Sequence, residues 1–394
     1  MTVADNIAGF LEKSSWIRKM FEEGTRRRKL YGEDNVFDFS IGNPNVPPPQ
    51  SFYEVLKKIA EENPPGIHGY MSNAGLPETR QAVADYLTNL GNKVFGLEDI
   101  IMTVGAGGGL NVVLKTILNP GEEVIIPSPY FVEYNFYLLN HQGVPKTVPV
   151  KDDMSLDINA IADAINEKTR AVIINSPNNP TGAVFSKDEL SILAGLLENK
   201  SSSYGRAIYI VYDEPYRKIV YDNIQLPNIT DIYNNSFIVT SFSKDLSLPG
   251  ERIGYAAVCP AMEAKQQIIA GMVFCNRVLG YVNAPALMQR VVAYLLNETV
   301  DVNIYKRKRD LLCNGLKELG YEFNIPKGAF YLFTKTPIND DIEFVKILQD
   351  ENILTVPGSG FEKSGYMRIA YCVSDKIIER SMGGFERAIK KALN

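Results

Sequence analysis

The sequence predicts an α/β fold with a mostly parallel central sheet in a large domain and a smaller α+β domain beside it. Strand-like apolar runs alternate with helical patterns between residues 100 and 259, which is the order that parallel sheets require. Polar motifs follow the ends of several of these runs, where open parallel sheets gather their binding sites. After residue 319 the pattern changes to short strands and a final helix.

The predicted strands of the central sheet are short runs rich in β-branched residues. Each run is bounded by turn residues or by a helical pattern, as buried strands are. These runs are residues 100–103, 124–126, 171–174, 208–211 and 237–240.

The smaller domain is predicted from a second set of elements. A long helical region covers residues 261–319, and a last helix starts at Lys376. Three short strands between them are expected at residues 329–333, 353–356 and 367–370. Strands grouped with helices in this way indicate an α+β unit.

Composition is that of a globular protein. Apolar residues make up 45% of the 394 residues, which is enough for a large core in roughly two or three domains. The net charge of -5 argues against general affinity for nucleic acid or membranes. The basic run at residues 26–29 follows Glu22 and Glu23 and is expected on the solvated face of an amphipathic helix. With neither a signal-like start nor a run of about 18 apolar residues, we expect a cytoplasmic protein.

Cysteine and histidine give no sign of a metal site or a disulfide framework. The two histidines, His68 and His141, do not have a metal-ligand spacing, so no metal is predicted. Scarce histidine also leaves little basis for a Ser-His-Asp hydrolase. The four cysteines are scattered and are expected to be reduced thiols: Cys259, Cys275, Cys313 and Cys372.

The segment 241–255, SFSKDLSLPGERIGY, pairs a lysine with an arginine after a predicted strand. Lys244 is a side chain of the kind that condenses with an aldehyde, and Arg252 is of the kind that grips a phosphate. A phosphorylated aldehyde, pyridoxal 5'-phosphate, needs both, and Ser241 and Ser243 would add hydroxyls to its phosphate. Taken alone, the segment would more often be an ordinary surface turn.

The segment 209–216, YIVYDEPY, places Asp213 at the end of another predicted strand. A carboxylate there could pair with the cofactor's pyridine nitrogen and keep the ring protonated, so that the ring withdraws electrons from the substrate's Cα. Tyr216 could bond the ring's phenolic oxygen. The alternative for Asp213 is a turn former or helix cap after a buried strand.

Two further motifs also follow strand-like runs. Asn179 in NSPNNPTG, residues 175–182, could donate to a cofactor oxygen, although a tight turn uses the same residues. VGAGGGL, residues 104–110, precedes a helical pattern, and the amides of its small residues could cradle a phosphate at the helix N-terminus. The candidates there are Gly105, Ala106 and Gly107. The run has the spacing of neither a Walker loop nor a dinucleotide fingerprint.

Taken together, these motifs resemble one enzyme family. NNPTG, YDEPY, SFSK with GERIGY, and a late MRIAY occur in the order and spacing of the class I/II (fold-type I) pyridoxal-phosphate-dependent aminotransferases. The resemblance covers most of the chain. It implies a ping-pong transfer of an amino group between an L-amino acid and a 2-oxo acid.

The resemblance assigns roles to the residues of the motifs. Lys244 is expected to attach the cofactor covalently and to move protons, with Asp213 on the pyridine nitrogen. Tyr216 and Asn179 are expected on the phenolic oxygen, and Tyr130, in PSPYFVEY, stacked on the ring.

Phosphate and substrate have their own expected partners. By resemblance, Arg252, Ser241 and the amides near Ala106 and Gly107 bind the phosphate. Arg368, in YMRIAY, would take the substrate's α-carboxylate as a bidentate partner. Asn179 and the backbone amide of Gly42 would add substrate contacts.

The family also implies an assembly and a division of the chain. Tyr70, in HGYMSNAGLPETR, matches a tyrosine that reaches the phosphate of a neighbouring subunit, so we expect a homodimer with shared sites. A large cofactor-binding domain is expected at residues 50–295, and a small domain from residues 1–49 and 296–394.

Substrate identity stays open at this point. An aspartate/2-oxoglutarate type would use an extra cation from the partner chain, and Arg277 is close to the corresponding region, although a surface role at a helix end fits it equally. One alternative function is a β-eliminating carbon-sulfur lyase, which would keep nearly all of these residues. Another is a non-catalytic cofactor-binding regulator, which usually carries a fused DNA-binding domain; we expect none here.

Overall fold

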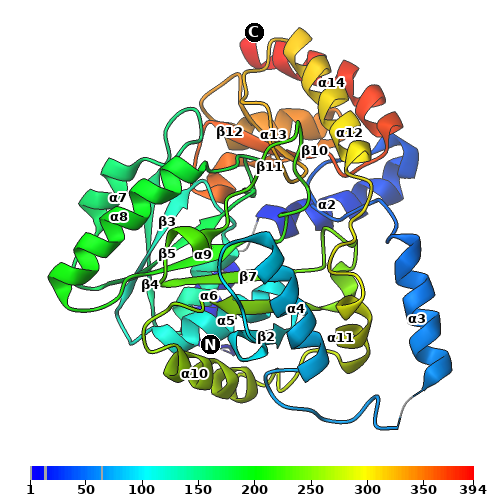
Figure 1. The fold of residues 1–394 in the computed structure, drawn as a ribbon. Helices are drawn as coiled ribbons and strands as arrows, with labels where there is room; N and C mark the ends of the chain where they lie inside the picture. Colours follow the sequence, from blue (N-terminus) through cyan, green and yellow to red (C-terminus); the bar gives the residue numbers. More distant parts are fainter. Residues whose placement is uncertain (1, 13–15, 64) are drawn as a thin grey trace.

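The computed structural model describes residues 2–12, 16–63 and 65–394. A seven-stranded sheet lies at the centre of the larger part, and helices cover both of its faces (Figure 1). The carboxy-terminal helices and strands gather at one end of the molecule, together with a helix from the amino-terminal region (Figure 1). The α/β class with a mostly parallel sheet is therefore confirmed.

The central sheet has the strand order β2-β8-β7-β6-β5-β3-β4. Four neighbouring pairs, from β4 through to β7, are parallel, and β8 runs antiparallel to both of its neighbours. The strands are β2 (Ile100–Thr103), β3 (Glu123–Ser128), β4 (Val144–Pro149), β5 (Thr169–Asn175), β6 (Tyr209–Asp213), β7 (Ser236–Ser241) and β8 (Gly254–Val258).

Several strands of the central sheet are buried on both faces of the sheet, which makes them recognisable in the sequence. Strands β2, β6 and β7 are buried at every position, so they read as continuous apolar runs. Four of the five predicted runs lie within strands, and the run 208–211 starts one residue before β6. The prediction lacks β4, an edge strand with several exposed residues, and β8, whose first two residues belong to the segment 241–255.

Helices flank this sheet, and their buried side chains pack against it. Helix α8 begins with a capping box, in which the Ser186 side chain accepts from the amide of Glu189 and the Glu189 carboxylate accepts from the amide of Ser186. The helices of this part are α3 (Gln50–Glu62), α4 (Pro77–Leu90), α5 (Gly105–Ile117), α6 (Glu133–Asn140), α7 (Ile158–Ala164), α8 (Lys187–Tyr204), α9 (Ile229–Ile232), α10 (Lys265–Val278) and α11 (Ala286–Ala293), with the 3-10 turns η2 (Leu97–Asp99) and η3 (Pro249–Glu251).

Two small sheets form the other part. A three-stranded antiparallel sheet has the order β11-β12-β9, and β1 pairs with β10 in parallel. The strands are β1 (Phe37–Asp38), β9 (Tyr331–Lys335), β10 (Ile353–Leu354), β11 (Val356–Pro357) and β12 (Tyr366–Ala370). The helices are α1 (Asp5–Glu12), α2 (Trp16–Tyr31), α12 (Val302–Glu318), α13 (Asp341–Asp350) and α14 (Asp375–Leu393), with the 3-10 turns η1 (Glu33–Asn35) and η4 (Gly358–Phe361).

This part matches its sequence prediction in outline, with differences in three places. The strand expected at residues 329–333 is β9, which begins and ends two residues later. The strand expected at residues 353–356 is two short strands, because β10 pairs with β1 while β11 pairs with β12. The basic run at residues 26–29 lies on α2, as expected. The helical region at 261–319 is three separate helices, α10, α11 and α12.

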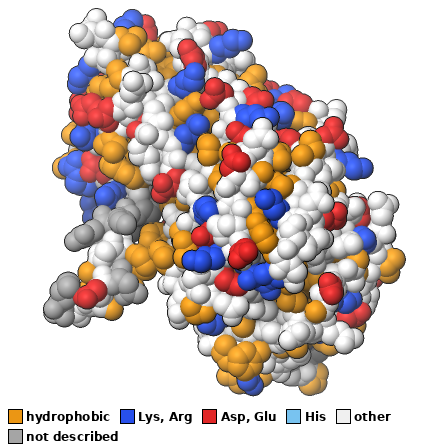
Figure 2. All heavy atoms as spheres, turned by 90° about the vertical axis from the view of Figure 1, so that its left-hand side faces the viewer, with side chains coloured by type: hydrophobic (Ala, Val, Ile, Leu, Met, Phe, Trp, Pro, Cys, Tyr) orange, Lys and Arg blue, Asp and Glu red, His pale blue; other side chains and the backbone are white. Residues whose placement is uncertain are grey.

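Three groups of buried apolar side chains form the core. Two of them contain side chains of the central sheet together with the helices against it. The third consists mainly of carboxy-terminal side chains, with others from the amino-terminal segment and from residues 150–221. All four cysteines are buried free thiols. Basic and acidic side chains are interspersed on the face shown in Figure 2. In the described parts of the chain, no helix is long and apolar enough to cross a membrane.

Candidate active site

Strands β5, β6 and β7 bring their carboxyl ends together at one edge of the central sheet. The parallel register sets Asn175, at the end of β5, beside Asp213, at the end of β6. Ser241 ends the next strand, β7, and Lys244 follows three residues later. Side chains that are distant in the sequence therefore meet here, as expected for an open parallel sheet.

Asp213 is a buried carboxyl group with one free oxygen. Its Oδ2 accepts a hydrogen bond of 2.5 Å from the hydroxyl of Tyr134, and Asn175 Nδ2 donates to the Asp213 backbone carbonyl at 2.9 Å. Its Oδ1 has no hydrogen-bond partner within the described residues. Burial raises the pKa of Asp213 to about 7, because the charged form loses its hydration. The carboxyl is held in place and lacks a cationic partner.

Lys244 lies on the turn after β7, and its side chain is half-buried. Its Nζ donates to the backbone carbonyl of Gly42 at 2.7 Å. The ammonium lies 5.9 Å from the ring centre of Tyr216 and 5.5 Å from that of Phe330. Burial lowers the pKa of Lys244 to about 8. A substantial fraction of this amine is therefore uncharged, and hence nucleophilic, at slightly alkaline pH.

Arg368 enters the site from β12 and is 1% exposed. Its Nη1 donates to Asn179 Oδ1 at 3.0 Å, and its Nη2 donates to the Ser40 carbonyl at 2.5 Å. Its Nε has no partner within the described residues. The guanidinium also lies 4.6 Å from the ring centre of Tyr331 and 4.8 Å from that of Phe361. A buried cation with an unused donor suits an anionic ligand.

Arg252 and the start of α5 form another edge of the site. Arg252 has a positive φ of 51° and donates from Nη1 to the Pro249 carbonyl at 2.9 Å. A Cβ on Gly105, the first residue of α5, would lie 2.9 Å from Arg252 Nη2. The small residue therefore lets the guanidinium approach the helix N-terminus, where unpaired amides favour an anion.

These groups surround one cavity of about 300 Å³. It is bounded by the large-sheet motifs, by the carboxy-terminal strands and by Gly42 from the amino-terminal segment. The lining residues are Gly42, Ala106, Gly107, Leu110, Phe131, Tyr134, Tyr137, Asn175, Asn179, Asp213, Pro215, Tyr216, Ser241, Ser243, Lys244, Pro249, Arg252, Tyr331 and Arg368.

Three of the residues predicted for the site do not line this cavity. Gly105 lies just behind it, against Arg252. Tyr70 is 95% exposed. Tyr130 lines a neighbouring cavity of about 420 Å³, and its hydroxyl donates to Asn135 Oδ1 at 2.9 Å. All the other predicted site residues are brought together.

The structure places Tyr130, predicted to stack on the ring, outside this cavity. The next residue, Phe131, lines the cavity instead. Two aromatic residues stand side by side in PSPYFVEY, and consecutive side chains of a chain that leaves a strand point in different directions. The segment alone does not say which of the two faces the site.

Sequence reasoning missed several lining residues. Tyr134 and Tyr137 come from α6, and the spacing of three residues places both on one helix face. Asn175 stands in the quoted motif NSPNNPTG but was given no role. Tyr331 belongs to β9 and carried no motif signal. Since these side chains reach the cavity through tertiary packing, only the order of the folded elements reveals them.

The fold and the cavity define a class of protein: an α/β protein with a half-buried lysine, a buried carboxyl and two arginines around one cavity at the carboxyl edge of its sheet. The family of class I and II aminotransferases matches residues 34–383, and the chain belongs to this family. It is an aminotransferase, so its substrates are expected to be amino acids and 2-oxo acids.

Individual relatives agree over nearly the whole chain. The probable aspartate aminotransferase of Methanocaldococcus jannaschii is 30% identical over 384 residues, which cover 94% of this chain and 96% of the relative. An aminotransferase structure from Eubacterium rectale superposes with a TM-score of 0.96 at 40% identity, covering 99% of each chain. The aspartate aminotransferase of Thermus thermophilus with maleate gives a TM-score of 0.87 at 26% identity, covering 98% of this chain and 100% of that one.

Proposed function

We propose that this aminotransferase binds pyridoxal 5'-phosphate in the cavity and transfers an amino group between an L-amino acid and a 2-oxo acid by a ping-pong mechanism. One observation carries the proposal: a half-buried lysine with a lowered pKa shares a cavity with the unpaired oxygen of a buried carboxyl. The cofactor, when bound, supplies an aldehyde and an electron-accepting ring.

Asp213 fits the ring nitrogen. Its Oδ1 is a buried acceptor without a donor among the described residues, which costs free energy until a donor arrives. A protonated pyridine nitrogen would be that donor. Its positive charge would also favour the ionised form of Asp213, because an opposite charge in a buried site lowers a carboxyl pKa.

The opposite end of the cavity fits the phosphate. Arg252, Ser241 and Ser243 line it together with Ala106 and Gly107 at the start of α5. This combination offers a guanidinium, hydroxyls and backbone amides, which are the donors that phosphate groups use. Gly105 contributes by giving Arg252 room, and Tyr70 would reach this site from a second subunit.

Tyr216 and Asn179 are proposed to hold the ring's phenolic oxygen. Both line the cavity. The backbone of Asn179 is held by Asn175, whose Oδ1 accepts a hydrogen bond of 2.7 Å from the Asn179 backbone N–H. Phe131 is proposed to stack on the ring in place of Tyr130, since Phe131 is the one that lines this cavity.

Arg368 is proposed to bind the substrate's α-carboxylate, assisted by Gly42 and Asn179. A carboxylate would use the unpaired Nε and would compete for the donors now given to Asn179 and the Ser40 carbonyl. Lys244 Nζ would then accept the proton from the substrate's Cα and return a proton when the new C–H bond forms. Its pKa of about 8 suits this exchange near neutral pH.

The amino donor is proposed to be aspartate, with 2-oxoglutarate as the acceptor. The support is that similar proteins from Methanocaldococcus jannaschii and Thermus thermophilus are aspartate aminotransferases by name. The cations among the lining residues, Lys244, Arg252 and Arg368, already have proposed partners. A second carboxylate would therefore use a donor from a partner chain, for which Arg277 is the candidate.

A homodimer of two-domain subunits in the cytoplasm is part of the proposal. Tyr70 and Arg277 are exposed at the surface of the chain, where a second copy could use them. A large domain at residues 50–295 and a small domain from 1–49 and 296–394 are supported by the pairing of β1 with β10. The buried free thiols fit a reducing compartment.

Lys244→Ala tests the proposed function directly. We expect the variant to lose transfer between aspartate and 2-oxoglutarate by several orders of magnitude, because no other buried amine lines the described cavity. Lys327→Ala, at an exposed lysine outside the cavity, is the control and should keep the wild-type rate. The readout is 2-oxo acid formation together with the visible absorbance of bound cofactor. Wild-type turnover by Lys244→Ala would contradict the assignment.

A further inference from the structure

Tyr331 is a buried tyrosine of the cavity that no sequence motif predicts. It begins β9, where it is the register partner of Ala370 on β12, two residues from Arg368. Its side chain is 2% exposed and lines the same cavity as Lys244. The residue therefore comes from the carboxy-terminal part and faces side chains of the central sheet.

Tyr331 makes two contacts with residues that have proposed roles. Its hydroxyl lies 2.8 Å from the hydroxyl of Tyr216, and its ring lies 4.6 Å from the Arg368 guanidinium. The Tyr216 and Tyr331 rings meet edge to face, with their centres 5.7 Å apart. One side chain thus touches both the proposed phenolic-oxygen donor and the proposed carboxylate clamp.

The direction of the bond between the two hydroxyls decides what Tyr216 can do. A hydroxyl has one proton, so Tyr216 can donate into the cavity only if it accepts from Tyr331. Tyr331 has no other hydrogen-bond acceptor within the described residues, so its proton is available for Tyr216. A hydroxyl that accepts one hydrogen bond is also a stronger donor of the next, because the chain of bonds polarises.

The position of the Tyr331 side chain depends on a glycine that packs directly against its hydroxyl. A Cβ on Gly42 would lie 1.9 Å from the Tyr331 hydroxyl, so any side chain there would displace the tyrosine. The carbonyl of Gly42 also accepts from Lys244 Nζ at 2.7 Å. The close approach of the amino-terminal segment therefore fixes the lysine and the tyrosine hydroxyl together.

We propose that Tyr331 is a positioning residue, whose hydroxyl donates to Tyr216 and thereby directs the Tyr216 proton toward the ring oxygen of the bound cofactor. This inference rests on the proposed function above. The Tyr331 ring has a separate role, because it covers one face of the Arg368 guanidinium. This contact does not need the Tyr331 hydroxyl.

The test is Tyr331→Phe in the enzyme loaded with pyridoxal phosphate. We expect kcat to fall about 3- to 10-fold, the range that corresponds to the loss of one hydrogen bond. The KM for the amino donor should stay within about 2-fold, because the phenyl ring still covers Arg368. The pH midpoint of the cofactor's visible band should rise by about 0.3 to 1 unit, since a weaker donor leaves more negative charge on the ring oxygen.

Two further variants separate positioning from a general structural effect. Tyr366→Phe removes a hydroxyl from the same sheet, where Tyr366 stacks on Phe333 at 5.0 Å and its hydroxyl makes no hydrogen bond in the described structure. It should match the wild type in kcat and pH midpoint. In a Tyr216→Phe background, Tyr331→Phe should add no further loss, because both changes remove the same bond.

The outcomes distinguish a failure of this inference from a failure of the proposed function. Two results would overturn the inference and leave the proposed function in place. One is an unchanged kcat and pH midpoint in Tyr331→Phe. The other is that Tyr331→Phe lowers kcat by the same factor in the Tyr216→Phe background as in the wild type. A wild-type protein that neither develops the visible band with pyridoxal phosphate nor forms a 2-oxo acid would overturn both. The pattern above, with an unchanged Tyr366→Phe control, would establish Tyr331 as the residue that orients Tyr216.

Discussion

Asp213 is a buried carboxyl and Lys244 a half-buried amine, and their pKa values move toward neutrality for the same reason. Burial raises the pKa of Asp213 to about 7 and lowers that of Lys244 to about 8, since each loses hydration in its charged form. Such shifts concentrate at functional sites and carry a cost in stability. Both residues are candidates from their strand-end motifs, but the environment that shifts their pKa values exists only in the folded chain.

Asp213→Asn measures that cost in the cofactor-free protein. The Asp213 pKa is about 7 when folded against a model value of 3.8, so between pH 4 and 7 the folded state holds a proton that the unfolded chain has lost. The free energy of unfolding of the wild type therefore falls over this range and stays lower above it. At pH 8 we expect the variant to be more stable than the wild type, by up to about 4 kcal/mol. Near pH 3.5 the difference should vanish.

Denaturant unfolding of both cofactor-free proteins at several pH values checks this expectation. The same variant, loaded with cofactor, should lose most of its transfer activity, because an amide cannot stabilise a protonated ring nitrogen as a carboxylate does. A stability difference that does not change between pH 4 and 8 would show that Asp213 keeps its ordinary pKa in the fold.

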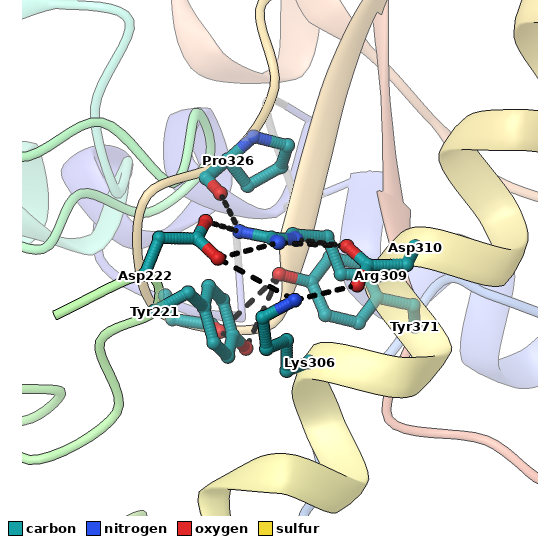
Figure 3. Close-up of polar contacts among 8 residues, drawn as sticks. Tyr221, Asp222, Lys306, Arg309, Asp310, Pro326 and Tyr371 are labelled. Atoms are coloured by element: carbon teal, nitrogen blue, oxygen red, sulfur yellow. Dashed lines mark hydrogen bonds and ion pairs between the residues drawn. The ribbon is translucent and has the colours of Figure 1, made fainter.

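At the scale of elements, a charged cluster connects α12 with two neighbouring segments (Figure 3). Arg309, on α12, is 4% exposed and pairs with Asp222 at 2.6 Å and with Asp310 at 2.7 Å. Lys306, one turn earlier, contacts both carboxylates, and the Arg309 guanidinium lies 4.8 Å from the Tyr221 ring centre. The cluster thereby joins α12 to the segment that follows the active-site strand β6.

Arg309→Met should destabilise the protein by about 1 to 3 kcal/mol. The loss of one partner of an ion pair destabilises a protein more strongly when the remaining charge is buried. Here the remaining carboxylate, Asp222, is 49% exposed and stays hydrated, so the effect is smaller. Arg307→Met, on the same helix, is the matched control. Arg307 is 63% exposed in its pair with Asp375, so its loss should change the free energy of unfolding by less than about 1 kcal/mol. Equal effects of the two variants in thermal or denaturant unfolding would contradict this ranking.

Element positions also show where sequence reasoning stops. Asp213, Lys244 and Asn179 could be placed together because each follows a strand of one parallel sheet, and the ends of such strands share an edge. Tyr331 could not, because it reaches the site through the pairing of β9 with β12 and the close approach of Gly42. The sequence does not show that Phe131, and not Tyr130, lines the cavity, because the direction of a side chain just after a strand depends on the turn that follows.

At the scale of the whole molecule, the cavity is shared between parts of the chain that are far apart in sequence. Lys244 and Asp213 come from the central sheet, while Arg368 and Gly42 come from the carboxy-terminal and amino-terminal parts. The segments that hold Tyr70 and Arg277 are tied together, since Asn276 Nδ2 donates to the Asn73 carbonyl at 2.7 Å. The fold class and family were predictable from motif order, whereas the substrate was not, because the side-chain end of the site depends on packing and on the proposed second subunit.

We propose that these residues together make the chain a pyridoxal-phosphate-dependent aminotransferase. The most direct measurement mixes the cofactor-loaded protein with single amino acids, aspartate first, and follows the visible band of the cofactor, the 2-oxo acid and ammonia. We predict that aspartate converts the cofactor to its aminated form with release of one 2-oxo acid per site, and that 2-oxoglutarate reverses the change. Ammonia and pyruvate with an unchanged cofactor would instead indicate a β-eliminating lyase, and the absence of any spectral or chemical change with every amino acid would contradict the account.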